Sequence, residues 1–91
     1  MTASADTPTV EFYWRPGCPF CMLLERSLKK KRIPFTKKNI WDDAAHAAVV
    51  RSLANGNETV PTVVVGSWFG VNPSAKDVVA AISTEAPELL C

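Results

Sequence analysis

The chain has 91 residues, of which 47% are hydrophobic and 21% charged, an ordinary composition for a globular protein that argues against disorder. Ten Lys and Arg against nine Asp and Glu leave a net charge of +1, which argues against binding nucleic acids or membranes through bulk charge. The length predicts a single domain over residues 1–91, with flexible ends at 1–8 and 87–91.

The three cysteines are better explained by chemistry than by structural pairing, because an odd number cannot all pair within one chain. Residues 1–8 lack the basic and apolar regions of a signal peptide, and no apolar run approaches the length of about 20 residues that spans a bilayer. We therefore expect a cytoplasmic protein, in a compartment where free thiols stay reduced.

The first predicted elements are a strand and a helix. Val10–Trp14 is rich in aromatic residues and mixes apolar with polar positions, which is typical of a strand. Pro19 suits the first position of a helix, because it lacks the N–H that would be unpaired there. Pro34 limits this helix. Three of its residues fall on one apolar face: Cys21, Leu24 and Leu28.

The middle of the chain predicts a second strand and helix, followed by a buried strand. Residues 35–40 are the weaker strand candidate, and Asp42 or Asp43 can cap a helix that stops at residues 55–57. The continuous β-branched run Thr62–Val65 is expected in a strand buried on both faces.

The last predicted elements are a short strand, Trp68 and Phe69, and a helix capped by Asn72 or Ser74 and limited by Pro87. We expect both strand–helix–strand passages to give parallel pairs with right-handed crossovers, and the last two strands to form an antiparallel hairpin. The predicted fold class is therefore α/β, with a four-stranded mixed sheet flanked by three helices on its two faces.

The motif Cys18-Pro19-Phe20-Cys21 is the most informative feature, because it joins a predicted strand to the start of a predicted helix. With Cys18 at the N-cap, its sulfur can accept hydrogen bonds from backbone N–H groups of the first turn. The helix dipole adds roughly half a positive charge there, and thiolates in such positions have pKa values of about 3.5–7.5, against about 8.5 for free cysteine. We expect Cys18 to be the nucleophile and Cys21 the resolving thiol.

The same motif could instead be half of a zinc site or a pair of inert structural cysteines. Zinc takes about four ligands, and the remaining candidates are Cys91, in the tail, and His46, within a predicted helix. That ligand set is poor, whereas the strand–turn–helix context favours redox chemistry.

Two stretches of the sequence carry a resemblance to a known family. Trp14 followed by Cys18-Pro19-Phe20-Cys21, together with residues 60–63 (Val-Pro-Thr-Val), resembles the glutaredoxins over residues 10–82. Within that family, residues 56–63 and 71–75 are similar to the mycoredoxins, the actinobacterial branch that uses mycothiol. The resemblance implies a thioredoxin fold.

The resemblance also implies a substrate-binding loop. Pro61 would be cis and face the active-site thiol, which leaves the backbone of Val60 free to pair with an extended substrate beside Thr59. From the residues alone, we would favour a proline that simply begins a strand, and the resemblance reverses that preference. Phe20, between the two cysteines, would line the substrate groove.

Four more residues are implied as substrate contacts, and each has a simpler possible role. Arg15 would favour the thiolate and contact a polar substrate, or it is an ordinary surface arginine. Asn72, Pro73 and Ser74 begin a helix whose free N–H groups can bind polar or anionic groups, or they only cap it.

Other conspicuous residues have less defined roles. Trp14 is better suited to packing than to binding, and Trp41 could flank the groove or staple the second helix. The six cations within residues 29–38 indicate a solvated face and favourable dipole contacts more than a docking patch for an acidic partner.

We interpret the protein as a thiol–disulfide oxidoreductase that reduces protein mixed disulfides through Cys18, using a low-molecular-weight thiol as co-substrate and no bound cofactor or metal. Glutathione-using glutaredoxins commonly have Gly-Gly where this chain has residues 71–75, so the resemblance favours mycothiol over glutathione. The expected partners are S-thiolated proteins and the small thiol, with no nucleic acid and no membrane, and the chain is expected to be a monomer.

Three alternatives to this interpretation are open. The first is an electron donor for ribonucleotide reductase that is recycled by thioredoxin reductase. The second is a protein that holds an iron–sulfur cluster between two subunits through Cys18, which Pro19 disfavours because cluster-binding members usually have Gly or Ser there. The third is a structural adaptor, against which the intact cysteine motif argues.

Overall fold

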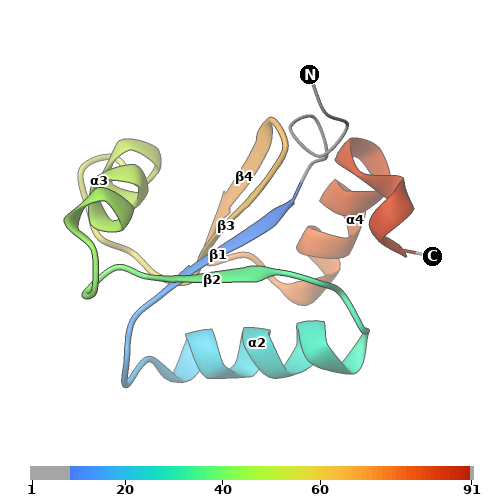
Figure 1. Cartoon of the computed structure of the whole chain (residues 1–91), viewed down its shortest axis with the longest axis horizontal. Coiled ribbons are helices and arrows are strands. Elements are labelled where there is room, and N and C mark those ends of the chain that lie inside the picture. Colours follow the sequence, from blue (N-terminus) through green and yellow to red (C-terminus); the bar gives the residue numbers. More distant parts are fainter. Residues whose placement is uncertain (1–8, 91) are drawn as a thin grey trace.

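The computed structural model describes residues 9–90 and contains every predicted helix and strand (Figure 1). Their bounds are β1 (Val10–Trp14), α2 (Pro19–Lys30), β2 (Thr36–Asn39), α3 (Ala44–Leu53), β3 (Thr62–Val65), β4 (Trp68–Val71) and α4 (Ala75–Glu85), followed by the 3-10 helix η1 (Pro87–Leu90).

The four strands form one mixed sheet in the order β2-β1-β3-β4. β1 pairs in parallel with β2, whereas β3 pairs antiparallel with both β1 and β4. The predicted hairpin is therefore confirmed, and β4 is longer than the two residues predicted for it. The sequence did not predict the length of β4 because Gly70 interrupts its β-favouring pattern.

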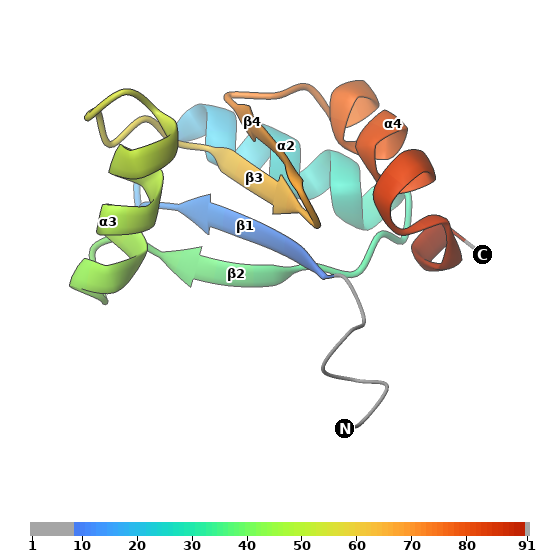
Figure 2. The same ribbon diagram turned by 90° about the horizontal axis from the view of Figure 1, so that it is seen from above.

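The predicted parallel pairing of the second strand–helix–strand passage is wrong, because β3 runs opposite to β1 and therefore to β2. The physical reason is the position of α3, which lies at the end of the sheet where β2 finishes (Figure 2). The chain re-enters the sheet at the end it has just left. Asn39, the last residue of β2, pairs with Trp14, and Thr62, the first residue of β3, pairs with the adjacent Tyr13.

Helices cover both faces of the sheet, as predicted. On one face Phe12 and Val63 are fully buried against α2 and α4, and the predicted apolar face of α2 lies in this core: Cys21, Leu24 and Leu28. On the other face Tyr13 packs with Val50 of α3 in a second, smaller core.

Side chains cap the two later helices at one of the two positions predicted for each. Asp43, not Asp42, caps α3 and accepts a hydrogen bond from the backbone N–H of Ala45 at 2.8 Å. Ser74, not Asn72, caps α4 in a reciprocal capping box with Asp77. Both caps satisfy N–H groups that have no partner within the helix.

The segment after α4 is the end predicted to be flexible, residues 87–91. Pro87–Leu90 form a 3-10 helix, and Leu89 packs against the larger core. Residues 1–8, the other end predicted to be flexible, and Cys91 lie outside the part that the structure describes. Among residues 9–90, no helix is long and apolar enough to cross a membrane.

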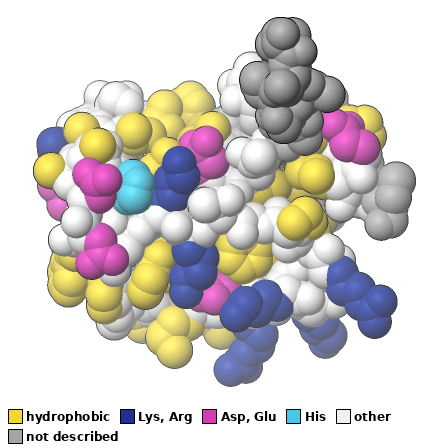
Figure 3. Space-filling view, viewed as in Figure 1, with side chains coloured by type: hydrophobic (Ala, Val, Ile, Leu, Met, Phe, Trp, Pro, Cys, Tyr) yellow, Lys and Arg dark blue, Asp and Glu magenta, His cyan; other side chains and the backbone are white. Residues whose placement is uncertain are grey.

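The cations of residues 29–38 lie along α2 and β2, where Figure 3 shows Lys and Arg side chains gathered below the sheet. Lys29 and Lys37 both contact the carboxylate of Glu25, at 3.1 and 3.2 Å. Partial burial opposes ionisation of Glu25, but the hydrogen bonds from these two lysines hold the pKa of its carboxyl below the usual value. Part of the basic run is therefore paired within the fold.

Candidate active site

Cys18 occupies the N-cap of α2, as the sequence predicts. The turn after β1 uses Gly17 in a left-handed conformation, with φ of 77°, and this brings the chain round to the helix start. The Cys18 Sγ accepts a hydrogen bond from the backbone N–H of Cys21 at 3.1 Å. The Cys18 sulfur thus accepts a hydrogen bond at the positive end of the helix dipole.

The two thiols are free and are both buried, with 3% of Cys18 and 1% of Cys21 exposed. Burial raises the pKa of the Cys21 thiol to about 12, and a hydrogen bond with Cys18 acts in the same direction. The backbone and the guanidinium charge of Arg15 oppose this shift. Cys21 is therefore protonated at neutral pH.

The free energy of unfolding is expected to fall as the pH rises from about 9 towards 12. Burial, and then the hydrogen bond to Glu11, also raise the pKa of Tyr13 to about 12 from an ordinary 10.0, and the ordinary value for Cys21 is 9.0. In this range the unfolded chain releases protons that the folded chain retains, so stability decreases. Urea unfolding in the presence of a reductant, at pH values of about 8, 10 and 11, measures the decrease.

Tyr13→Phe and Cys21→Ser should each flatten that alkaline decrease, because each removes one of the retained protons. A free energy of unfolding that stays constant across the same pH range in the unmodified protein would contradict the expectation.

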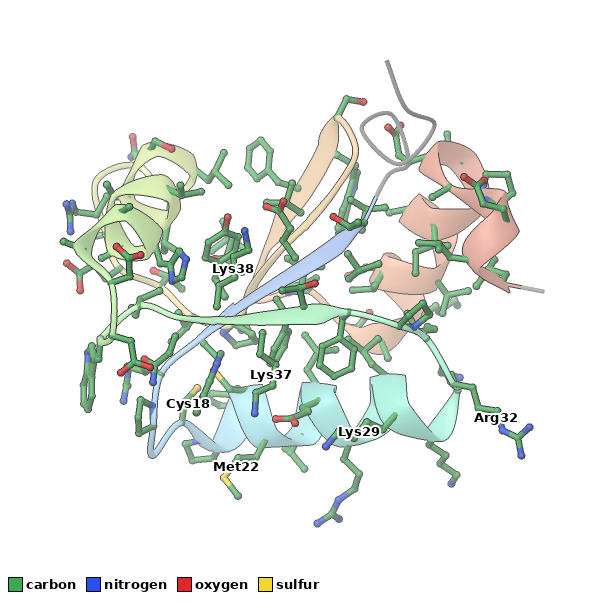
Figure 4. All side chains as sticks on the ribbon, in the orientation of Figure 1. Cys18, Met22, Lys29, Arg32, Lys37 and Lys38 are labelled. Atoms are coloured by element: carbon green, nitrogen blue, oxygen red, sulfur yellow. The ribbon has the colours of Figure 1, made fainter. Side chains whose placement is uncertain are left out.

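The predicted loop at Val60 and Pro61 lies against the thiols, and the peptide bond between these two residues is cis, as expected. The Cys18 Sγ is 3.9 Å from the carbonyl oxygen of Val60. The backbone N–H of Asn72 donates to the carbonyl oxygen of Pro61 at 2.7 Å. Residues far apart in the sequence therefore meet at one end of the sheet, where Figure 4 shows Cys18 at the start of α2.

A shallow groove of about 210 Å³ runs between α2 and the start of α4. Four predicted site residues line it: Phe20, Asn72, Pro73 and Ser74. Phe20 is 63% exposed beside the cysteines. The rest of the lining was not predicted as part of the site: Leu23, Leu24, Ser27 and Ala75. A larger groove of about 440 Å³ lies along α4 and includes none of the predicted site residues.

The spacing of the α2 residues is the signal that could have identified the helix residues of the groove that were not predicted. Counting from Phe20, the other α2 residues of the groove follow at three, four and seven positions, which places all of them on one helix face: Leu23, Leu24 and Ser27.

The remaining predicted site residues, Arg15 and Thr59, do not line this groove. The guanidinium of Arg15 lies over the ring of Trp41, 5.8 Å from its centroid. Thr59 is exposed, and its carbonyl oxygen accepts a hydrogen bond from the hydroxyl of Thr62 at 2.8 Å. Arg15 thus contacts Trp41 and not the residues of the groove.

A zinc site at the two cysteines would need further ligands, and the described part of the chain places none beside them. No three His, Cys, Asp or Glu side chains among residues 9–90 form a group that could hold a metal ion. His46 instead lies on α3, with its Nδ1 3.3 Å from the carbonyl oxygen of Asn39 and its ring edge-on to Tyr13.

The sequence of this chain is similar to those of known glutaredoxins. Residues 10–69 match the glutaredoxin family. Two proteins from two strains of Mycobacterium tuberculosis, provisionally named glutaredoxins, are 34% identical over 77 residues, which cover 84% of this chain and 92% of theirs.

Solved structures show the same fold. A thioredoxin-like protein superposes with a TM-score of 0.71 at 20% identity, covering 80% of this chain and 99% of its own. The glutaredoxin of Brucella melitensis gives 0.61 at 24% identity, covering 90% of this chain and 85% of its own. The predicted thioredoxin fold is therefore confirmed.

Proposed function

The chain belongs to the glutaredoxin family, and from this membership we propose that it removes mycothiol from S-thiolated proteins, with Cys18 as the nucleophile. Glutaredoxins are thiol–disulfide oxidoreductases that act on thiolated proteins with a low-molecular-weight thiol as co-substrate.

The observation that carries the proposal is the environment of the two sulfurs. The Cys18 sulfur accepts an N–H hydrogen bond at a helix start, so backbone dipoles stabilise negative charge on it. Both residues are buried, and the raised pKa of the Cys21 thiol keeps it protonated. The hydrogen bond to one sulfur and the raised pKa of the other support Cys18 as the nucleophile and Cys21 as the resolving thiol.

The proposed reaction has two exchange steps. The Cys18 thiolate attacks the small-thiol sulfur of the mixed disulfide, a bond forms between these sulfurs, and the protein thiolate leaves with the electron pair of the broken bond and takes up a proton. The thiolate of a second small thiol then attacks the adduct on Cys18. This step releases the small-thiol disulfide and restores Cys18, so the protein thiol is regenerated and one free small thiol is oxidised into a disulfide with the one removed from the substrate.

In a second route, Cys21 loses its proton and displaces the small thiol from Cys18, which closes an internal disulfide that an external thiol must reduce. The 3.1 Å contact between the Cys21 N–H and the Cys18 sulfur keeps the two residues within one helical turn for this step.

Support for mycothiol comes from the residues at the start of α4. Asn72, Pro73 and Ser74 line the groove beside Phe20 and stand where glutathione-using glutaredoxins commonly have Gly-Gly. Mycothiol presents a sugar-linked acetylcysteine in place of the carboxylates of glutathione, and the described part of the groove has no Lys or Arg in its lining to meet such carboxylates. We place the reaction in the cytoplasm, which keeps free thiols reduced, with the chain acting as a monomer.

Mass spectrometry of a trapped adduct tests the proposal. Cys21→Ser, incubated with equal amounts of mycothiol disulfide and glutathione disulfide, is expected to gain the mass of mycothiol on Cys18, because Cys21 is no longer present to release it. A Cys18→Ser/Cys21→Ser double variant is the matched control, since it retains only Cys91. Modification of Cys18 by glutathione in preference to mycothiol would contradict the proposed thiol.

A further inference from the structure

Trp41 is an exposed aromatic residue that the core does not explain. Its side chain belongs to neither hydrophobic core, and the residue is 63% exposed. A hydrophobic staple is one of the two roles that the sequence suggests for it, but a staple needs an apolar residue directly before the N-cap. Because Asp43 is the N-cap of α3, that position belongs to Asp42. Packing within the described residues therefore does not explain why an aromatic side chain stands at position 41.

The position of Trp41 is fixed by the ends of two parallel strands. The backbone N–H of Ile40 donates to the carbonyl oxygen of Trp14 at 2.9 Å, which extends the pairing of β2 with β1. The N–H of Trp41 then donates to Oδ1 of Asn39 at 2.8 Å. Arg15 is the first residue after β1 and Trp41 the second after β2, so both lie beyond the carboxyl ends of parallel strands, the side of an α/β sheet where ligands commonly bind.

The Arg15 guanidinium interacts both with the ring of Trp41 and with the thiol of Cys21. It lies 5.8 Å from the centroid of the Trp41 ring and acts electrostatically on Cys21. Its one hydrogen bond within the described residues is a long one, 3.5 Å, to the carbonyl oxygen of Pro16, and it has no carboxylate partner there. Because a guanidinium carries five N–H donors, most of its donors can serve a ligand.

We propose that Trp41 and Arg15 form a subsite for the sugar portion of the small thiol, separate from the groove that Phe20 lines. The apolar C–H face of a sugar ring would pack on the indole ring, and its hydroxyl oxygens would accept hydrogen bonds from the guanidinium. The inference rests on the proposed function, because it assumes a sugar-linked thiol as the co-substrate. It adds Trp41 as a specificity residue and gives Arg15 a defined ligand group.

Two mixed disulfides of one peptide test the subsite, the first with mycothiol and the second with N-acetylcysteine, which has the same reacting group without the sugar. Trp41→Ala is expected to lower kcat/KM for the mycothiol substrate about 10-fold, mainly through KM, and to leave the N-acetylcysteine substrate unchanged. Trp41→Phe keeps an aromatic face and should retain most of the activity. Phe69→Ala, which removes an aromatic residue 47% exposed on β4, is the control and should change neither value.

The outcomes separate the subsite from the proposed function. If the unmodified protein prefers mycothiol and Trp41→Ala keeps that preference, the subsite is wrong and the proposed function stands. If the unmodified protein reduces both substrates equally well, the subsite is wrong and the proposed function stands. If it does not reduce the mycothiol substrate at all, the proposed function fails and the subsite fails with it. An equal loss on both substrates would show that Trp41 acts on folding or on the thiols instead, which also overturns the subsite. Thermal unfolding of Trp41→Ala and Trp41→Phe accompanies the kinetics to detect a loss of fold.

Discussion

Cys18→Ser is expected to lower the rate of mixed-disulfide reduction by at least about 100-fold, because a serine hydroxyl stays protonated and does not attack a disulfide at neutral pH. The substitution keeps a side-chain acceptor at the N-cap of α2, where Cys18 now accepts the N–H of Cys21 at 3.1 Å. Serine is itself a favoured N-cap residue, so the helix start should be preserved. The measurement is the rate at which a thiolated peptide is converted to the peptide with a free thiol, followed with the small thiol in excess.

Cys21→Ser is the matched control for this experiment, since the same substitution is made three residues further on. It should retain reduction of the mixed disulfide by the route that needs only Cys18. Activity of Cys18→Ser close to that of the unmodified protein would refute the assignment of the nucleophile, and an equal loss in both variants would show that the route requires Cys21.

Phe12→Ala is expected to lower the free energy of unfolding by about 3–5 kcal/mol, the range for removing a buried aromatic side chain. Phe12 is fully buried on β1 in the larger core and packs against the ring of Phe35, with 5.4 Å between the ring centroids. The loss combines the buried apolar area with the cavity that remains. Urea unfolding followed by circular dichroism measures it.

Phe20→Ala makes the same substitution at a residue that is 63% exposed, and its stability should stay within about 0.5 kcal/mol of the unmodified protein. If Phe12→Ala does not fold, Phe12→Leu gives the smaller change that can still be measured. Equal stability of Phe12→Ala and the unmodified protein would contradict the core position of Phe12.

The local features of this fold could be predicted because each depends on a few adjacent residues. Cys18 followed by Pro19 predicts the start of α2, and the run Thr62–Val65 predicts a central strand. The direction of β3 could not be predicted in the same way, because it depends on where α3 packs. A helix that runs back along the sheet returns the chain to the end where the previous strand began, so the next strand is parallel. In contrast, α3 stays at the end of the sheet where β2 finishes, so β3 runs in the opposite direction (Figure 2).

In the candidate site, too, the local features could be predicted and the contacts between distant residues could not. The N-cap position of Cys18 is readable from its own motif. The contact of its sulfur with Val60, 42 residues away, could be expected only through the family resemblance. The contact between Arg15 and Trp41 could not be predicted, because it depends on the register of β1 against β2. Neither segment has a local sequence pattern that determines this register.

Both ends of the described chain lie at the end of the sheet opposite Cys18. β1 begins at Val10, which pairs with Val65, and Glu85 at the end of α4 accepts a hydrogen bond from the N–H of Ser67 in the turn after β3. Cys18 follows the far end of β1, as Figures 1 and 4 show. A tether or reporter domain fused at either end would therefore sit behind the dithiol. The protein can be immobilised on an electrode or joined to a fluorescent redox reporter with its reactive end facing solution.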